Sequence, residues 1–201
     1  LNDTTYLPDM MHYMNRLVGR IEDQLTALGL RENTLLLFVG DNGTDRDVVS
    51  TWRGQRIRGD KGYPTEYGTH VPLIASWPGR IAAGSRNPNL VDFTDFLPTL
   101  LEAAGDTPPP NLQLDGLSFF PQLMRAAKAP AREWVFCDYA PRWGKFPEAR
   151  YAHDHRWKLY ADGRFYNLKN DIGEERPLTR EELPEEGQQA RKKLENVLKR
   201  M

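Results

Sequence analysis

Two oxygen-bearing side chains, Asp41 and Asn42, stand next to each other in a turn flanked by glycines. Carboxylate and amide oxygens are the ligands that hard divalent cations such as Ca²⁺ and Mg²⁺ prefer. An ordinary turn is the alternative, because Asn-Gly is favoured in turns for backbone reasons alone. The turn follows an apolar run, Leu35 to Val39, and open α/β sheets place their ligands at such strand ends. This position favours a cation site.

Lys61 is the second candidate, in the segment Arg58-Gly59-Asp60-Lys61-Gly62. Flanking glycines let the backbone come close to a ligand, and a compact ammonium can neutralise a sulfate or phosphate oxygen. A solvated surface lysine is the alternative. The surrounding polar stretch, residues 44–69, is longer than most unstructured connections, so we expect it to be functional or locally ordered.

The first half of the chain reads as α/β. Apolar residues at helical spacing predict an amphipathic helix over residues 7–28, with Met10, Met11 and Met14 as core. A continuous apolar run predicts a strand at 34–39, buried on both faces. We expect a second strand at 71–77 in the same sheet, and a helix at 98–104 that packs on this sheet together with the first helix.

The hydrophobic pattern of the sequence changes after three prolines at 108–110. Short apolar runs predict strands at 134–139, 150–152, 155–160 and 164–168, with Asp162-Gly163 as a hairpin turn. A helix is expected over 181–201. The predicted fold is therefore part of an α/β domain over residues 1–110, followed by a small α+β region with an antiparallel sheet and a C-terminal helix over residues 111–201.

Composition removes several classes. The chain has 201 residues, 27 basic and 28 acidic side chains, and a net charge of -1. It has no overall field to attract nucleic acid or an anionic membrane, so neither is expected as a partner. No apolar run approaches the ~18 residues of a membrane span. The single cysteine, Cys137, excludes an intramolecular disulfide and is expected to be a small buried side chain.

Several short segments of the sequence follow one another in the order seen in one protein family. The relevant segments are Gly-Leu-Arg-Glu-Asn-Thr-Leu-Leu-Leu-Phe-Val-Gly-Asp-Asn-Gly-Thr (29–44), Lys61 to Pro72, Trp77-Pro78-Gly79, Asp95 to Leu101, Leu114 to Phe119, and Phe165 to Glu174. Each segment alone is weak evidence, but their collinear order is specific. Together they resemble the C-terminal portion of the type I sulfatases, formylglycine-dependent members of the alkaline phosphatase superfamily.

The resemblance implies a role for each candidate. Asp41 and Asn42 would be ligands of Ca²⁺, and Lys61 would be a catalytic residue that binds the sulfate. The formylglycine nucleophile arises from Cys/Ser-x-Pro/Ala-x-Arg, in a part of the family's sequence N-terminal to the residues present here, and Cys137 does not fit that pattern. The chain alone is therefore expected to be inactive and to bind calcium poorly.

The resemblance also implies partners and a location. The substrate would be a small sulfate ester or a sulfated carbohydrate, and a further partner would be the missing N-terminal half of the same protein. A periplasmic or secreted location is typical of this family in bacteria.

Departures and alternatives qualify these roles. Thr65, Tyr67 and His70 differ from the family's usual residues, and we expect His70 to be structural rather than catalytic. A phosphodiesterase or phosphonate hydrolase of the same superfamily is an alternative, although such relatives typically carry histidine where this chain has Asn42. A non-catalytic binding module is another. The upstream sequence, with or without the nucleophile pattern, would discriminate among them.

Overall fold

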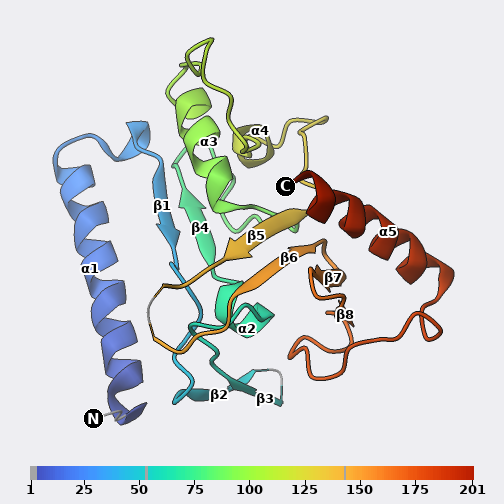
Figure 1. Ribbon diagram of the computed structural model, residues 1–201. Helices are drawn as coiled ribbons and strands as arrows, with labels where there is room; N and C mark the ends of the chain where they lie inside the picture. Colours follow the sequence, from blue (N-terminus) through green and yellow to red (C-terminus); the bar gives the residue numbers. More distant parts are fainter. Residues whose placement is uncertain (1–3, 53, 143) are drawn as a thin grey trace.

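The computed structural model describes residues 4–52, 54–142 and 144–201. Figure 1 shows helices around three small sheets. The helices are α1 (Leu7–Ala27), α2 (Glu66–Thr69), α3 (Phe96–Ala103), α4 (Phe120–Leu123) and α5 (Glu185–Arg200), with short 3-10 turns η1 (Thr4–Tyr6), η2 (Arg31–Asn33) and η3 (Phe93–Asp95). The strands are β1 (Leu36–Val39), β2 (Val49–Trp52), β3 (Gln55–Arg58), β4 (Leu73–Ser76), β5 (Val135–Tyr139), β6 (Ala149–His153), β7 (Trp157–Tyr160) and β8 (Phe165–Asn167).

The first sheet contains the two predicted strands of the α/β part. β1 pairs antiparallel with β4, with Val39 opposite Leu73 and Leu36 opposite Ser76. The predicted helix over 7–28 is α1, which runs alongside β1 in Figure 1. Arg31 links α1 to β4, since its guanidinium donates to Glu22 of α1 and to the Ser76 hydroxyl of β4. The expectation that both strands lie in one sheet is confirmed, whereas the packing of the two predicted helices on this sheet stays a prediction.

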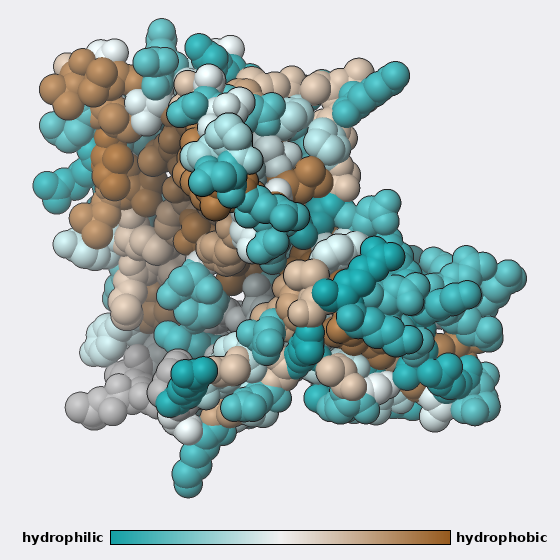
Figure 2. Space-filling view, turned by 45° about the horizontal axis from the view of Figure 1, so that its top comes forward, coloured by the Kyte–Doolittle hydropathy of each residue, from teal (hydrophilic) through white to brown (hydrophobic). Residues whose placement is uncertain are grey.

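The apolar face of this part is more exposed than the sequence predicts. Met10 and Met11 were expected in the core, but they are 65% and 52% exposed, and no residue of α1 is buried. All four residues of β1 are only partly buried, so the prediction of burial on both faces is also wrong for this chain. Figure 2 shows apolar residues gathered over this side of the molecule. Periodicity marks which residues favour burial, but none of the described segments covers them.

The polar stretch after β1 is locally ordered, as expected, and contains a hairpin that the sequence analysis did not predict. β2 pairs antiparallel with β3, and Gly54 makes the tight turn with φ +78°. All four residues of β2 are exposed. Without a buried face the segment lacks the hydrophobic alternation that marks most strands.

The predicted antiparallel sheet of the C-terminal part is confirmed, with strand order β5-β6-β7-β8. The Asp162-Gly163 turn joins β7 to β8, with Gly163 at φ +95°. α5 covers this sheet, and Leu194 and Val197 of the helix pack with the stacked rings of Trp157 and Phe165. The main core of the described chain is therefore in this part. The division near residue 110 stays a prediction.

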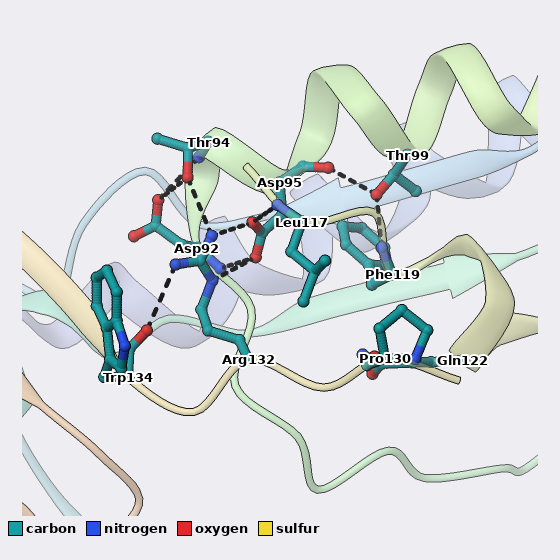
Figure 3. A network of polar contacts seen from close by, with 10 residues as sticks. All are labelled: Asp92, Thr94, Asp95, Thr99, Leu117, Phe119, Gln122, Pro130, Arg132 and Trp134. Carbon is teal, nitrogen blue, oxygen red and sulfur yellow. Dashed lines mark hydrogen bonds and ion pairs between the residues drawn. The ribbon is translucent and has the colours of Figure 1, made fainter. Parts of the chain in front are cut away.

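A buried carboxylate organises the helix α3 and the loop that follows it (Figure 3). Asp95 is 1% exposed and forms an ion pair with Arg132. The same carboxylate accepts hydrogen bonds from the backbone N–H groups of Asp92 at 2.8 Å and Leu117 at 2.6 Å. One turn later, the Thr99 hydroxyl accepts from Phe119 N–H at 2.9 Å. Buried polar contacts thus hold together two separate segments of the sequence, residues 95–101 and 114–119.

A second buried network joins the C-terminal sheet to the segment before α2. Lys158 of β7 has no exposed surface, and its ammonium donates to Glu174 at 2.8 Å and to the carbonyl of Pro64 at 2.5 Å. It lies 3.8 Å from the carboxylate of Glu66. The Tyr160 hydroxyl donates to the other oxygen of Glu174. Two carboxylates from distant segments share one buried cation, so this network fixes the two parts of the chain to each other.

None of the described helices is both long enough and apolar enough to cross a membrane.

We predict that Lys158→Met lowers the free energy of unfolding by about 3–5 kcal/mol. Removing the ammonium leaves the buried carboxylate of Glu174 without its cation, and breaking a buried ion pair from one side costs about this much. Urea unfolding at neutral pH measures the change. The matched control is Lys169→Met at an exposed lysine, which should change stability by less than about 0.5 kcal/mol. Equal stability of Lys158→Met and wild type would contradict the assigned role.

Candidate functional site

A cavity of about 1440 Å³ lies at the carboxyl end of β1. Asp41, Asn42 and Lys61 all line it, together with residues of α2 and of the β5–β6 sheet. The three residues singled out from the sequence therefore face one common space, although they lie in two separate turns.

The turn that carries Asp41 and Asn42 is fixed by backbone contacts on both sides. Gly40 N–H donates to the carbonyl of Pro72 at 3.1 Å, which extends the β1–β4 pairing by one step. Gly43 N–H donates to the carbonyl of Gly68 at 2.8 Å. A Cβ atom at position 43 would overlap the Tyr67 carbonyl oxygen, so only glycine allows this close approach. The two oxygen donors are held between these anchors.

The turn that carries Lys61 is anchored in a similar way. Lys61 N–H donates to the carbonyl of Thr44 at 3.0 Å, which places this turn against the one that holds Asp41. Gly62 has φ +87°, and a Cβ there would overlap the ring of Phe146. The Tyr139 hydroxyl donates to the Gly62 carbonyl at 2.9 Å. The Lys61 side chain itself is exposed. The C-terminal sheet thus positions the backbone of the lysine.

The donor set suits Ca²⁺ but is incomplete. Asp41 supplies a carboxylate and Asn42 an amide oxygen, the hard oxygen donors that Ca²⁺ takes. Ca²⁺ usually needs six to eight oxygens, and the described residues contain no group of three or more His, Cys, Asp or Glu that could hold a metal ion. These two residues fit part of a calcium site.

The polar residues of α2 form an electrostatic cluster beside the cavity. Burial alone would raise the pKa of Glu66, but its hydrogen bond to His70 and the charges of His153 and Lys158 lower it to about 2. His70 Nδ1 lies 3.3 Å from the Glu66 carboxylate, and this hydrogen bond raises the histidine pKa. His70 therefore pairs with Glu66 one helical turn earlier, but it also lines the cavity, so its structural rather than catalytic role stays a prediction.

The two other departures from the family pattern also act locally. The Thr65 hydroxyl donates to Asp60 at 2.5 Å, next to Lys61. Tyr67 brings its carbonyl against Gly43, and its pKa is raised by burial and by Glu175 and Asp171. Neither Thr65 nor the Tyr67 side chain is among the residues that line the cavity.

Cys137 is half-buried rather than fully buried, and it lines the cavity wall. Burial raises the pKa of its thiol, which keeps the group protonated at neutral pH. A neutral thiol is a poor nucleophile, which agrees with the sequence-based exclusion of Cys137 from catalysis.

A second segment matches the letters of the nucleophile pattern and was not considered in the sequence analysis. Ser76-Trp77-Pro78-Gly79-Arg80 reads Ser-x-Pro-x-Arg. Ser76, however, pairs with Leu36 at the end of β1 opposite to Asp41, and its hydroxyl accepts a hydrogen bond from Arg31 at 2.5 Å. It does not line the cavity. Its place in the sheet therefore argues against a nucleophile at this segment.

The sequence analysis also missed the buried charged residues that hold α2 in place beside the cavity. Glu66 belongs to the quoted lysine segment, Glu174 ends the closing segment, and Lys158 was read only as part of a strand. Glu174 Oε1 accepts a hydrogen bond from Glu66 N–H at 2.9 Å. Each of these glutamates lies in a segment quoted for the family resemblance, which could have marked it as a candidate. Nothing in the sequence indicated that the two residues contact each other.

Two family models match this chain. The model described as "Sulfatase" matches residues 3–106, and the model described as "N-sulphoglucosamine sulphohydrolase, C-terminal" matches residues 58–200. The chain belongs to the sulfatase family. This places it in the alkaline phosphatase superfamily, as the resemblance implied.

Curated relatives agree with this assignment. Human arylsulfatase A is 37% identical over 131 residues, which cover 64% of this chain and 25% of that protein. Arylsulfatase G of Mus musculus is 38% identical over 114 residues, which cover 51% of this chain and 22% of that protein. The chain thus spans about a quarter of the length of these sulfatases.

Solved structures confirm the predicted fold class. A protein in complex with its substrate D-glucosamine-2-N,6-O-disulfate matches with a TM-score of 0.73 at 25% identity, over 90% of this chain and 37% of that one. The PsFucS1 sulfatase from Pseudoalteromonas sp. matches with a TM-score of 0.71 at 25% identity, over 95% of this chain and 42% of that one.

We predict that Glu66 makes stability depend on acidity. Because its pKa in the folded chain is about 2, below its ordinary value of 4.5, its contribution is present above pH 4.5 and is lost as the pH falls from there toward 2. The loss amounts to at most about 3 kcal/mol. The measurement is urea unfolding between pH 5 and pH 3, a range in which His70 stays charged.

The control is Glu66→Gln, which removes the titrating group. This variant should be less stable than wild type at pH 5 and should lose less stability on acidification. Parallel stability curves for the two proteins would show that Glu66 does not carry this dependence.

Proposed function

We propose that the protein containing this chain hydrolyses sulfate esters, with Asp41 and Asn42 as two ligands of Ca²⁺ and Lys61 as the residue that binds the sulfate. The observation that carries the proposal is that these three residues line one cavity in a chain of the sulfatase family. Backbone contacts at Gly43 and Gly62 hold both turns in place, as preorganised electrostatic catalysis requires.

The chemistry assigns separate tasks to the charges. Transfer of a sulfuryl group spreads negative charge over oxygen atoms. The Lys61 ammonium would contact a sulfate oxygen and favour the charge that develops as the ester oxygen departs. A bound Ca²⁺ would supply a second positive charge at the sulfate. Asp41 and Asn42 would hold and orient that ion.

The rest of the site would come from sequence outside this chain. Two oxygen donors leave most of the calcium coordination to other residues, and the formylglycine nucleophile would also lie in the N-terminal half. Two observations support this division: the chain spans a quarter of human arylsulfatase A, and the apolar face over α1 and β1 is open among the described residues. The chain alone would then be inactive.

For the substrate we propose a sulfated carbohydrate, with a small aromatic sulfate ester as the simpler alternative. One structural neighbour was solved with a disulfated glucosamine as its substrate, and a second match is to a C-terminal model of a sulphoglucosamine sulphohydrolase. The family resemblance also supports a periplasmic or secreted location, which fractionation of the source cells would test.

We predict that Lys61→Ala in the full-length protein lowers kcat for sulfate-ester hydrolysis by about a hundredfold or more, while calcium affinity changes little. The variant removes a preorganised charge from the sulfate and leaves the metal ligands intact. Steady-state kinetics and calcium titration measure the two effects. Lys145→Ala, at an exposed lysine that does not line the cavity, is the control. Unchanged turnover in Lys61→Ala would return this residue to the solvated surface.

We predict that Asp41→Ala in the full-length protein affects calcium affinity first and activity only as a consequence. Loss of an anionic ligand should weaken calcium binding at least tenfold, and high Ca²⁺ should restore part of the activity by mass action. Asp115→Ala, at an exposed aspartate outside the cavity, is the matched control. Full activity of Asp41→Ala after treatment with a chelator would exclude Asp41 as a calcium ligand.

A further inference from the structure

A second hollow, of about 420 Å³, lies between α5 and the segment that leads into β5. We call it the α5 groove. Its lining consists of Glu133, Trp134, Gln189, Lys192, Lys193, Asn196, Val197 and Arg200. None of these residues lines the cavity at Asp41 and Lys61, so the groove is a separate feature of the surface.

The groove follows one stripe of the helix. The lining positions on α5 recur every three or four residues from Gln189 to Arg200, which is the spacing of one helix face. Eleven residues of helix rise about 16 Å, so the stripe is much longer than a single sulfate group. The shape therefore suits an extended chain rather than a small ion.

The charge of the groove is positive. Lys193 forms an ion pair with Glu133 at 3.0 Å, which neutralises the acidic residue of the lining. Lys192 and Arg200 make no ion pair or side-chain hydrogen bond within the described part of the chain. Glu195, an acidic residue of the same helix, is paired elsewhere, with Arg180 at 3.0 Å and Arg191 at 3.2 Å. Two cations are thus left for a ligand.

The two cations are well separated. Lys192 and Arg200 lie eight residues apart on α5, which is about 12 Å along the helix axis. One compact anion cannot reach both, whereas a chain with repeated anionic groups can. The chain has a net charge of -1, which by itself gives no long-range attraction for a nucleic acid. Local contacts must therefore select the ligand.

The remaining lining residues favour a sugar. Trp134 is a partly exposed aromatic residue of the lining, and it packs against the C-terminal core. Gln189 and Asn196 present amide groups, which can donate to and accept from hydroxyl groups. An aromatic surface, paired amides and spaced cations match the ring faces, hydroxyls and sulfate groups of a sulfated oligosaccharide.

We propose that the α5 groove binds a sulfated polysaccharide chain and holds it on the enzyme apart from the site of hydrolysis. The choice of a sulfated polyanion rests on the proposed function. The binding itself needs no turnover, so the two proposals can fail separately.

The test measures binding of a heparin oligosaccharide to the full chain by isothermal titration calorimetry. The double variant Lys192→Ala/Arg200→Ala should weaken binding about tenfold and reduce its dependence on salt. The matched control is Lys128→Ala/Lys199→Ala, which removes two charges at exposed positions outside the groove. This control should bind like wild type.

Three further measurements complete the test. Desulfated heparin should bind much more weakly than heparin, and inorganic sulfate should not compete at millimolar concentration. Trp134→Phe should remove the change in tryptophan fluorescence that heparin causes in wild type. The proposal is overturned by equal losses in both double variants, by equal binding of desulfated heparin, or by tighter binding of a single-stranded DNA of similar length. If the full-length protein binds heparin but does not hydrolyse sulfate esters, that result would count against the proposed function alone.

Discussion

The buried ammonium of Lys158 is the contact on which the arrangement of this chain depends. A fully buried cation is costly unless it is paired, and Lys158 is paired with Glu174 and lies near Glu66. These groups come from β7, from the loop after β8 and from α2, so satisfying one charge fixes three distant segments. Glu174 also holds the backbone of Glu66, the first residue of the helical turn that packs on Gly43. The position of the turn that carries Asp41 and Asn42 thus depends on a charge that lies in the other half of the chain.

Close packing at two glycines also fixes the turns that carry Asp41 and Lys61. Gly43 lies against the carbonyl of Tyr67, and Gly62 lies under the ring of Phe146. Side chains at these positions would push the two turns apart, and Asp41 and Lys61 would no longer face one cavity. The C-terminal sheet contributes directly, because the Tyr139 hydroxyl donates to the Gly62 carbonyl. The small sheet is therefore part of the support of the site and not an independent appendage.

The distribution of exposed surface divides the molecule. The C-terminal part encloses a core around Trp157, Phe165 and Leu194, whereas α1 exposes an apolar stripe and β1 is only half-covered. The open face belongs to the same part of the chain as Asp41 and Asn42. The chain spans about a quarter of the length of human arylsulfatase A.

Local patterns in the sequence determined most of the elements and the chemistry of the candidates. Helical spacing predicted α1, apolar runs predicted β1 and β4, and the Asp-Gly dipeptide predicted the β7–β8 turn, because each depends on neighbours within a few residues. The residue types at Asp41, Asn42 and Lys61 allowed a cation and an anion, and the collinear segments around them, rather than these residues alone, gave them those roles. Only the tertiary structure decided what these groups meet: that Ser76 lies at the far end of the sheet, that Met10 and Met11 are exposed, and that Glu66 shares a buried lysine with Glu174. Contacts between segments about a hundred residues apart are set by burial and charge pairing in three dimensions, and no local spacing in a single sequence encodes them.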